Sequence, residues 1–488
     1  MGNNFFTLVN VSLSCNHLSH MYIKTVVLAA LLALTGLEGF SQRIPGSPAN
    51  QVILPSGEQL AYQQMELVGF IHFTVNTFTD KEWGYGDEDP ALFNPLELDA
   101  EQWARVASDA GMKELILTAK HHDGFCLWPS DCTEHSVKNS PFRNGNGDVV
   151  REFTDACRKY GLKVGLYLSP WDRNHPAYGT PEYITYYRNQ LRELLTAYGE
   201  INEIWFDGAN GGDGYYGGAN EVRRIDRETY YDWPNTVKLV KELQPGIKIF
   251  SDAGPDIRWV GNEHGHAGET FWSTISGEKL VIGDSDPAYL NRGDPAGNRW
   301  IVGQCDVSIR PGWFYHASED TMVKSPQELV DIYYKSVGRN AVLLLNLPPD
   351  RRGLIHEHDV ESMMGFRKII NATFAKDLAE GASIKVIPGG DEPLELRMEL
   401  PAPVLFDRIL LQEPVEEGQR VSRFRVEAED QQGDWAEIAR GTTIGYKRIL
   451  RISPVNTRHI RVLVDEAIHP PSISQIGLYK ASGREPSF

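Results

Sequence analysis

Apolar runs that alternate with helical patterns over residues 60–350 constrain the fold more than any other feature of this sequence. Eight runs resemble β-strands, several with few polar residues, and helix-like segments lie between them. A near-continuous apolar run is typical of a parallel strand that other elements cover on both faces. Eight such strands with intervening helices predict a TIM-like (β/α)8 barrel in the α/β class. The expected strands are 67–76, 114–121, 163–169, 201–207, 247–252, 256–260, 300–307 and 341–347.

The C-terminal part of the chain follows a different pattern. After about residue 384, segments such as L-E-L-R-M-E-L alternate apolar and polar residues, with turn residues between them. This alternation predicts a C-terminal antiparallel β-sandwich of roughly 100 residues. We therefore expect an N-terminal extension and signal peptide at 1–41, a catalytic barrel at 42–356, a linking helix at 357–383 and a β-sandwich domain at 384–488.

The N-terminal segment resembles an export signal. From Met21, one lysine precedes an apolar run of about 11 residues, and small residues then lead to Ser41 and Gln42. The run is short for a membrane span, and residues 1–20 are interpreted as an upstream start. We expect secretion across the inner membrane into the periplasm, with no stable membrane span in the mature form. An N-terminal anchor helix is the alternative.

The net charge argues against two classes of partner, and the cysteine content argues against a disulfide scaffold and a zinc site. The formal net charge of −18 argues against nucleic acid and against anionic membrane surfaces. Five cysteines in 488 residues do not make a disulfide scaffold, and no C-x-x-C spacing suggests zinc. We expect buried thiols at the four cysteines beyond the export signal, with a Cys126–Cys132 bridge as the alternative.

Histidines, aromatic residues and carboxylates gather where the expected strands end. In a TIM barrel the carboxyl ends of the strands form the catalytic face. The run I-W-F-D-G stops on Asp207, which either caps a turn or does chemistry, because a buried charge without a partner is costly. Aromatic rings can cover the C–H face of a sugar while polar side chains bind its hydroxyls. The residues on this face are His72, Trp83, His121, His122, Tyr167, Trp205, Asp207, Arg258, Glu263 and Trp313.

Sugar chemistry of the retaining kind requires two carboxyl groups, one ionised and one protonated. Asp207, at a strand end, suits the nucleophile, and Glu263, on a glycine-flanked loop, suits the general acid. The simpler interpretations are a turn residue for Asp207 and a solvated loop residue for Glu263. His121-His122-Asp123 is a weaker candidate for a metal site, because adjacent side chains on a strand point to opposite faces. No metal and no cofactor is expected.

Several motifs together resemble the family 29 glycoside hydrolases, which are exo-acting α-L-fucosidases. They are F-I-H-F, E-W-G-Y-G, A-K-H-H-D-G-F-C-L-W-P-S, L-Y-L-S-P-W, I-W-F-D-G-A and L-L-L-N-L-P-P-D, within roughly residues 60–350. The resemblance implies a fucosylated oligosaccharide or glycoconjugate as substrate and a retaining mechanism with Asp207 as nucleophile. It also implies fucose contacts from His72, His121, His122, Tyr167 and Trp205, with Trp83, Arg258 and Trp313 as further candidates.

The segment R-W-V-G-N-E-x-G resembles the branch of this family that cleaves α-1,3 and α-1,4 fucosyl linkages in Lewis-type glycans. That assigns the acid/base role to Glu263, with Glu269 in reserve, and implies carboxyl groups about 5–5.5 Å apart. The alternatives are a broad-specificity α-L-fucosidase, an exo-glycosidase for a related galacto-configured sugar, and a glycan-binding protein without catalysis. The expected sandwich resembles carbohydrate-binding modules, and both sugar binding and a structural role remain open for it.

Overall fold

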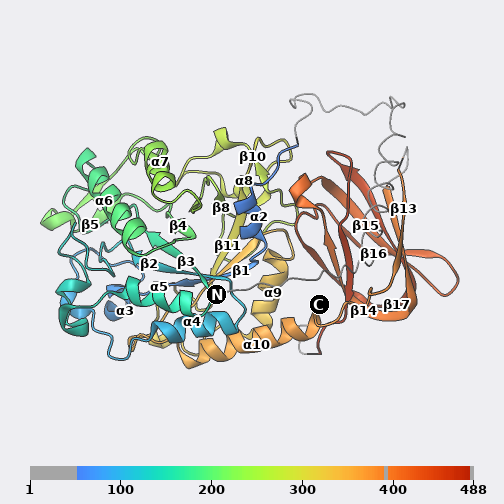
Figure 1. Ribbon diagram of the computed structural model, residues 1–488, viewed down its shortest axis with the longest axis horizontal. Coiled ribbons are helices and arrows are strands. Elements are labelled where there is room, and N and C mark those ends of the chain that lie inside the picture. The colour runs from blue at the N-terminus through green and yellow to red at the C-terminus, as the bar shows by residue number, and fades with distance from the viewer. Residues whose placement is uncertain (1–51, 390–393, 484–488) are drawn as a thin grey trace, which may run out of the picture. The chain divides into compact units, whose positions relative to one another are not determined.

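The computed structural model describes residues 52–389 and 394–483, and the expected export signal lies outside them. The chain from Val52 onward forms one compact unit that contains a barrel and a C-terminal antiparallel sheet. Figure 1 shows the barrel strands with helices around them, and the C-terminal strands in orange and red.

Eight parallel strands close into a barrel, which confirms the expected architecture. Their order around the barrel is β1-β12-β11-β8-β7-β4-β3-β2. Each strand overlaps one of the eight runs expected from the sequence. The strands are β1 (Leu67–Ile71), β2 (Glu114–Lys120), β3 (Lys163–Leu168), β4 (Glu203–Trp205), β7 (Lys248–Ser251), β8 (Ile257–Trp259), β11 (Val302–Ser308) and β12 (Val342–Asn346).

Helices lie between the barrel strands, and local sequence explains where they begin and end. The side chains of Asp99 and Asp148 accept backbone N–H groups at the start of α4 and α5. Gly111 and Gly161 follow these helices with φ of +87° and +71°, a conformation that glycine adopts without strain. The α-helices are α2 (Gly57–Gln63), α3 (Val75–Thr79), α4 (Ala100–Asp109), α5 (Val149–Lys159), α6 (Pro181–Ala197), α7 (Trp233–Leu243), α8 (Pro287–Arg292), α9 (Pro326–Ser336) and α10 (Glu357–Thr373).

The loops at the carboxyl ends of the barrel strands contain short elements of their own. The glycine- and tyrosine-rich insertion after β4 forms a hairpin of β5 (Gly212–Gly214) and β6 (Glu221–Arg223). A second small pair, β9 (Thr274–Ile275) and β10 (Arg299–Trp300), lies in the irregular stretch after β8. The 3-10 turns are η1 (Pro90–Leu92), η2 (Val137–Asn139), η3 (Phe142–Gly145), η4 (Tyr216–Gly218), η5 (Gly277–Lys279), η6 (Ala317–Glu319) and η7 (Val415–Glu417).

Helix α2 closes the N-terminal end of the barrel. Its capping box joins Ser56 and Gln59, and the Gln59 side chain donates to the carbonyl of Trp300 at 2.7 Å. Tyr62 is fully buried, and its hydroxyl accepts a hydrogen bond from Gln304 on β11. We therefore expect the opposite end of the barrel, where the strands finish, to receive a ligand.

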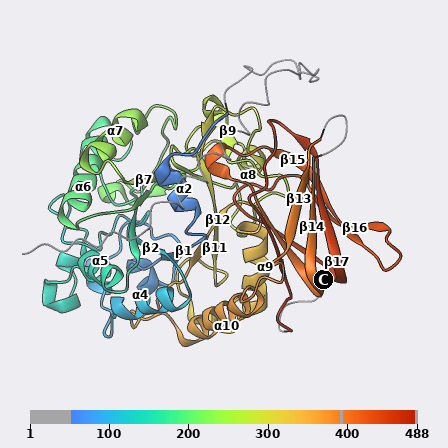
Figure 2. The same ribbon diagram turned by 45° about the vertical axis from the view of Figure 1, so that its right-hand side comes forward.

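The expected sandwich is built from one antiparallel sheet in which two long strands run through both layers. The first part of β14 pairs with β13 and with the second half of β17, and its last part pairs with β18. Side chains from both parts share one apolar core, so the sheet folds over on itself. The strands, of which Figure 2 labels β13 to β17, are β13 (Ser383–Ile387), β14 (Leu394–Gln412), β15 (Val421–Glu429), β16 (Trp435–Gly441), β17 (Arg448–Ala467) and β18 (Gln475–Tyr479).

Polar contacts join this sheet to the barrel. The Gln419 side chain accepts the N–H of Ser273 and donates to the carbonyl of Phe271, both at 2.9 Å. Arg451 on β17 pairs with Asp331 on α9 at 2.8 Å. These contacts tie the sheet to the loop after β8 and to the helix after β11.

Two further expectations concern the state of the cysteines and the presence of a membrane span. Among the four cysteines that the structure describes, Cys126, Cys157 and Cys305 are buried thiols, while Cys132 is only half-buried. None of the four forms a disulfide, so the alternative Cys126–Cys132 bridge is absent. In the described part of the chain, every helix is too short or too polar to cross a bilayer.

Candidate active site

Asp207 lies just beyond β4, at the mouth of the barrel. Its Oδ1 accepts the N–H of Ala209 at 2.7 Å, and its Oδ2 accepts the hydroxyl of Tyr167 at 3.0 Å. One quarter of the side chain remains exposed (25%). A side chain at Gly208 would meet the carboxylate of Asp252 at 2.6 Å, so the D-G pair permits this close turn. Asp207 therefore closes a turn with one oxygen and keeps the other at the mouth.

Three neutral histidines surround the mouth. His72 Nδ1 lies 2.9 Å from Asn346 Oδ1, and His122 Nδ1 lies 2.7 Å from Ser169 Oγ. Burial lowers the pKa of His72 and of His122 to about 3, and it lowers the pKa of His121 as well. A neutral imidazole has one donor and one acceptor nitrogen, which suits it to bind hydroxyl groups.

The H-H-D-G segment turns both of its histidines toward the same site. Because the pair follows β2, its rings are not on opposite faces as strand geometry would require, and their centroids lie 4.1 Å apart. Asp123 accepts the N–H of Phe125 at 2.7 Å, and Gly124 has a φ of +81°. His121 Nδ1 is buried with no partner in the described residues. In the same residues no three His, Cys, Asp or Glu side chains converge as metal ligands.

Tryptophans form the floor and walls of the mouth. Trp205 is buried, and its Nε1 donates to Gln304 Oε1 at 2.9 Å, so its ring is fixed from below. Trp83 is half exposed (52%), which leaves a ring surface open to a sugar. The nearest rings are Phe250 at 4.0 Å from Trp205, His72 at 5.1 Å from Trp313 and His122 at 5.2 Å from Trp83.

Glu263 and its reserve differ in their surroundings. Glu263 is exposed, and its Oε2 accepts the indole N–H of Trp313 at 3.2 Å, which connects it to the mouth. Glu269 forms ion pairs with Arg339 and Arg448. Although burial acts to raise the pKa of Glu269, these two pairs lower it below its ordinary value. A general acid must keep its proton near neutral pH, so Glu269 is unsuited to that role.

The expectation that Arg258 contacts a sugar does not fit the structure. Its side chain is fully buried, and the guanidinium donates to backbone carbonyls, among them those of Trp272 at 2.7 Å and Leu290 at 3.2 Å. In the sequence, a cationic side chain at a strand end looks like a residue that contacts a ligand. Here it satisfies carbonyl groups of the irregular loop that follows, which would otherwise be buried without partners.

Two buried carboxyl groups at the mouth are absent from the sequence-derived candidates. Asp306 lies on β11, and burial, with the carboxylates of Glu263 and Asp207 nearby, raises its pKa well above the usual range. Asp252 follows β7 and accepts the N–H of Gly283 at 2.6 Å, and burial raises its pKa to about 6. Asp252 ends an expected strand, so reading every strand end for carboxylates would have found it, whereas Asp306 lies inside a strand.

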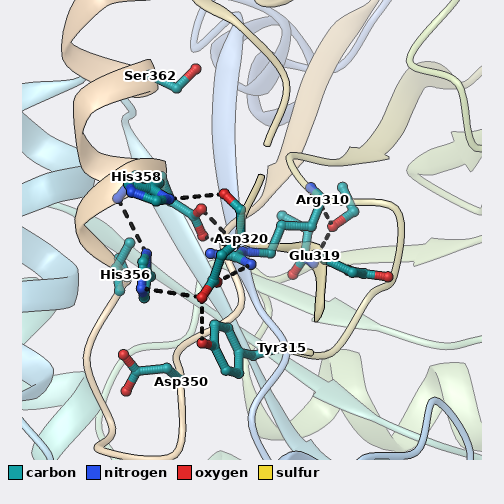
Figure 3. Close-up of polar contacts among 12 residues, drawn as sticks. Arg310, Tyr315, Glu319, Asp320, Asp350, His356, His358 and Ser362 are labelled. Carbon is teal, nitrogen blue, oxygen red and sulfur yellow. Dashed lines mark hydrogen bonds and ion pairs between the residues drawn. The ribbon is translucent and has the colours of Figure 1, made fainter. Parts of the chain in front are cut away.

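The loop that carries Trp313 is held from two sides. The carboxylate of Glu82 accepts the N–H groups of Trp313 and Phe314 at 2.8 and 3.0 Å. On the other side a polar cluster fixes the base of the loop (Figure 3): Arg310 donates to Asp320 at 2.9 Å. The same cluster contains Asp359, Tyr315, His356 and His358. Hydrogen bonds on both sides therefore hold the loop that positions Trp313.

The mouth of this TIM-like barrel combines a partly exposed carboxylate with neutral imidazoles and an open indole surface. This combination is what a glycoside hydrolase requires. Comparison with known proteins narrows the class, because residues 56–371 match the α-L-fucosidase family. The chain belongs to that family, family 29 of the glycoside hydrolases, and is an α-L-fucosidase acting on fucosylated substrates.

Relatives from plants and bacteria agree with this assignment. Alpha-L-fucosidase 1 of Arabidopsis thaliana is 43% identical over 480 residues, which cover 92% of each chain. A crystal structure of a glycoside hydrolase 29 family member from an unknown rumen bacterium is 51% identical with a TM-score of 0.84, covering 88% of this chain and 78% of that one. A Ruminococcus gnavus family 29 fucosidase in complex with fucose is 33% identical with a TM-score of 0.79, covering 92% and 98%.

Proposed function

We propose that this protein is a retaining exo-α-L-fucosidase that releases terminal L-fucose from α-1,3/1,4-fucosylated, Lewis-type glycans. The observation that carries the proposal is the placement of Asp207. One oxygen is used by the turn, and the other is held at the mouth by the hydroxyl of Tyr167. A carboxylate fixed in this way is ready to attack an anomeric carbon from one defined direction.

In the first step, Asp207 Oδ2 attacks the anomeric carbon of fucose and the bond to the leaving oxygen breaks. Glu263 donates its proton to that oxygen, so the remaining glycan leaves as a neutral alcohol. The product on the enzyme is a covalent fucosyl ester of Asp207. The hydrogen bond from the indole N–H of Trp313 connects Glu263 to the mouth, which supports a role for Glu263 at the leaving group.

In the second step, Glu263 is ionised and takes a proton from a water molecule. The water oxygen attacks the anomeric carbon, the ester bond breaks, and Asp207 is released as a carboxylate. The hydroxyl of Tyr167 stabilises that departing charge. Two inversions restore the original configuration, and the expected 5–5.5 Å separation of the carboxyl groups stays a prediction.

The fucose hydroxyls bind the neutral imidazoles of His72, His121 and His122. Trp313 and Trp83 pack against the C5 methyl face, since an indole ring buries apolar C–H groups. The complex of the Ruminococcus gnavus relative with fucose supports fucose as the sugar that binds here. The R-W-V-G-N-E-x-G segment supports the Lewis-type linkage, and the N-terminal resemblance to an export signal supports action in the periplasm.

Three substrates test this function: an aryl α-L-fucoside, a Lewis-type branched trisaccharide and an aryl α-L-galactoside. We expect cleavage of the trisaccharide, with little activity on the aryl fucoside and less on the galactoside. Proton NMR of the first product should show the α anomer. Strong aryl fucoside activity with broad linkage tolerance would instead indicate the broad-specificity alternative. Preference for the galactoside would indicate the galacto-configured one, and a β product would exclude retention.

A further inference from the structure

His316 lies between two carboxylates of a neighbouring segment. Its Nε2 lies 2.8 Å from Glu82 Oε1, and its Nδ1 lies 2.8 Å from Asp80 Oδ1. Both carboxylates belong to the segment after α3, which continues directly into Trp83, whereas His316 belongs to the loop after β11 that carries Trp313. The imidazole therefore joins the two segments that hold the tryptophans of the mouth.

The two contacts of His316 fit the doubly protonated form of the ring. An ionised carboxylate only accepts hydrogen bonds, so each contact needs a hydrogen on the imidazole nitrogen. A neutral imidazole has one N–H and would point a lone pair at the other carboxylate, whereas the cation satisfies both. Although burial acts to lower the pKa of His316, the bonds to Asp80 and Glu82 raise it above the ordinary value of 6.5. Glu319, on η6, is a further carboxylate that raises this pKa.

Glu82 transmits the contact with the imidazole to the backbone of Trp313. Its Oε2 accepts the N–H of Trp313 at 2.8 Å, and its Oε1 accepts both the N–H of Phe314 at 3.0 Å and the contact from His316. A Cβ at Gly312 would come within 2.6 Å of Glu82 Oε1 and 3.0 Å of the His316 ring, so glycine permits this close approach. A shift of the Glu82 carboxylate would therefore displace the backbone that carries the indole.

We propose that His316 is a positioning residue that, as a cation, ties the segment of Trp83 to the loop of Trp313 and so holds both indoles for the sugar. The proposal rests on the proposed function, in which these indoles pack against the C5 methyl face of fucose. When His316 loses its proton, one of its two contacts is lost, because a single N–H remains. Glu82 is then held less firmly, and fucose binding weakens as pH rises.

Three variants isolate the imidazole. Asp80→Asn removes one carboxylate at an exposed position (61%), where the backbone φ of +60° is one that Asn also adopts. His316→Gln keeps a hydrogen-bond donor but cannot titrate. Asp87→Asn is the matched control, because Asp87 is an exposed aspartate of the same segment, and the contacts of His316 are with Asp80 and Glu82 instead.

The inhibition constant of L-fucose against an aryl α-L-fucoside, measured between about pH 5.5 and about pH 9, is the first readout. Dividing each value by that of His316→Gln removes the titration of the catalytic carboxyl groups, which the proteins share. At the acidic end the wild type should bind fucose at least about threefold more tightly than His316→Gln, and this advantage should disappear as pH rises. A ratio that is constant over the pH range overturns the proposal.

The two aspartate variants test the origin of that pH dependence. In Asp80→Asn the advantage over His316→Gln should disappear about 0.5 to 1 pH unit lower than in the wild type, because loss of an opposite charge lowers the pKa of the imidazole. Asp87→Asn should follow the wild type. Equal shifts in both variants would mean that the net charge of the segment, and not the contact with His316, sets the profile.

Melting temperatures separate positioning from stability. The raised pKa of His316 means that its contribution to stability is present below the unfolded pKa and is lost as pH rises through the folded pKa. The melting-temperature advantage of the wild type over His316→Gln should therefore shrink over the pH range in which the fucose advantage disappears. If it shrank while fucose binding stayed constant, the imidazole would stabilise the loop without positioning the indoles. If it shrank in a wild type that neither binds fucose nor hydrolyses a fucoside, the proposed function would fail and the tie between the two segments would stand.

Discussion

The two ends of the barrel both bury carboxyl groups, but only one end exposes any of them to a substrate. At the mouth, Asp207 keeps a quarter of its side chain exposed. At the closed end, Glu203 and Glu114 are fully buried near Tyr62 of α2. Burial raises the pKa of all three carboxyl groups. A raised pKa therefore shows that a carboxyl group is shielded from water, whereas a catalytic carboxyl group must also be accessible to the substrate.

Hydrogen bonding also differs between the two ends. Both oxygens of Asp207 accept hydrogen bonds. At the closed end Asn202 donates to Glu114 at 2.8 Å and Gln304 donates to Glu203 at 3.3 Å, but one oxygen of each carboxyl has no partner in the described residues. Protonation of a carboxyl removes the cost of a buried, half-solvated charge. The unpaired oxygens at the closed end thus favour the protonated form of its carboxyl groups, whereas the two hydrogen bonds to Asp207 favour an oriented, ionised carboxylate at the mouth.

The largest expected effect is on catalytic activity, and it distinguishes Asp207 at the mouth from Glu203 at the closed end. Asp207→Gly should lower kcat/KM on an aryl α-L-fucoside by at least about 10³-fold, because no other group can form the covalent intermediate. Glu203→Gln, the matched change at the closed end, should lower it less than about 10-fold. Wild-type activity in Asp207→Gly would refute the nucleophile. An equal loss in Glu203→Gln would show that the closed end acts on the mouth through Gln304, which bonds both Glu203 and Trp205.

The next effect distinguishes two glutamates near the mouth. Glu263→Gln should lower kcat/KM for a Lewis-type trisaccharide by about 10²-fold or more, as expected for loss of a general acid. An aryl fucoside has a good leaving group that depends less on protonation, so its kcat/KM should fall less. Azide, which attacks without a base, should restore part of the turnover. Glu269→Gln is the control, because Glu269 is held by Arg339 and Arg448. A larger loss in Glu269→Gln would reverse the assignment.

The barrel and the position of Asp207 could be predicted from sequence for the same physical reason. Parallel strands covered on both faces are apolar almost throughout, so a carboxylate where such a run stops is conspicuous. Arg258 and Asp306 show where this reasoning fails. The first bonds carbonyls of an irregular loop with no repeating pattern, and the second lies inside a strand, where its inward direction depends on register.

A smaller effect concerns the acidic limb of the pH profile. Burial raises the pKa of Asp207, and the hydrogen bond from Tyr167 opposes that shift. Tyr167→Phe removes the opposing bond, so the pKa should rise further. Because Asp207 must be ionised to attack, kcat/KM should then be lost at a higher pH as the solution is acidified, by up to about one pH unit.

A buried tyrosine elsewhere provides the control for that shift. Tyr187 donates its hydroxyl to the carbonyl of Leu168 at 3.0 Å and is not among the groups that shift the pKa of Asp207. Tyr187→Phe should lower stability by about 1 kcal/mol and leave the acidic limb where it is. If both variants moved the limb equally, its position would report the packing of the barrel wall and not the bond to Asp207.

The smallest effect tests the closed end by stability. Glu203 has a folded-state pKa above the ordinary value of 4.5, mainly through burial. The folded protein therefore binds an extra proton over the pH range between the unfolded and folded pKa values, and stability falls as pH rises through that range. Glu203→Gln cannot ionise, so its melting temperature relative to wild type should rise by at least about 1 °C between about pH 5 and about pH 8.

Glu466→Gln, at an exposed ion pair, should show no such trend. A constant difference for Glu203→Gln would mean that Glu203 is ionised in the folded protein, with Lys248 as its counter-charge. The closed end would then hold a stable anion as the mouth does, and exposure and hydrogen bonding would be the properties that separate the two ends.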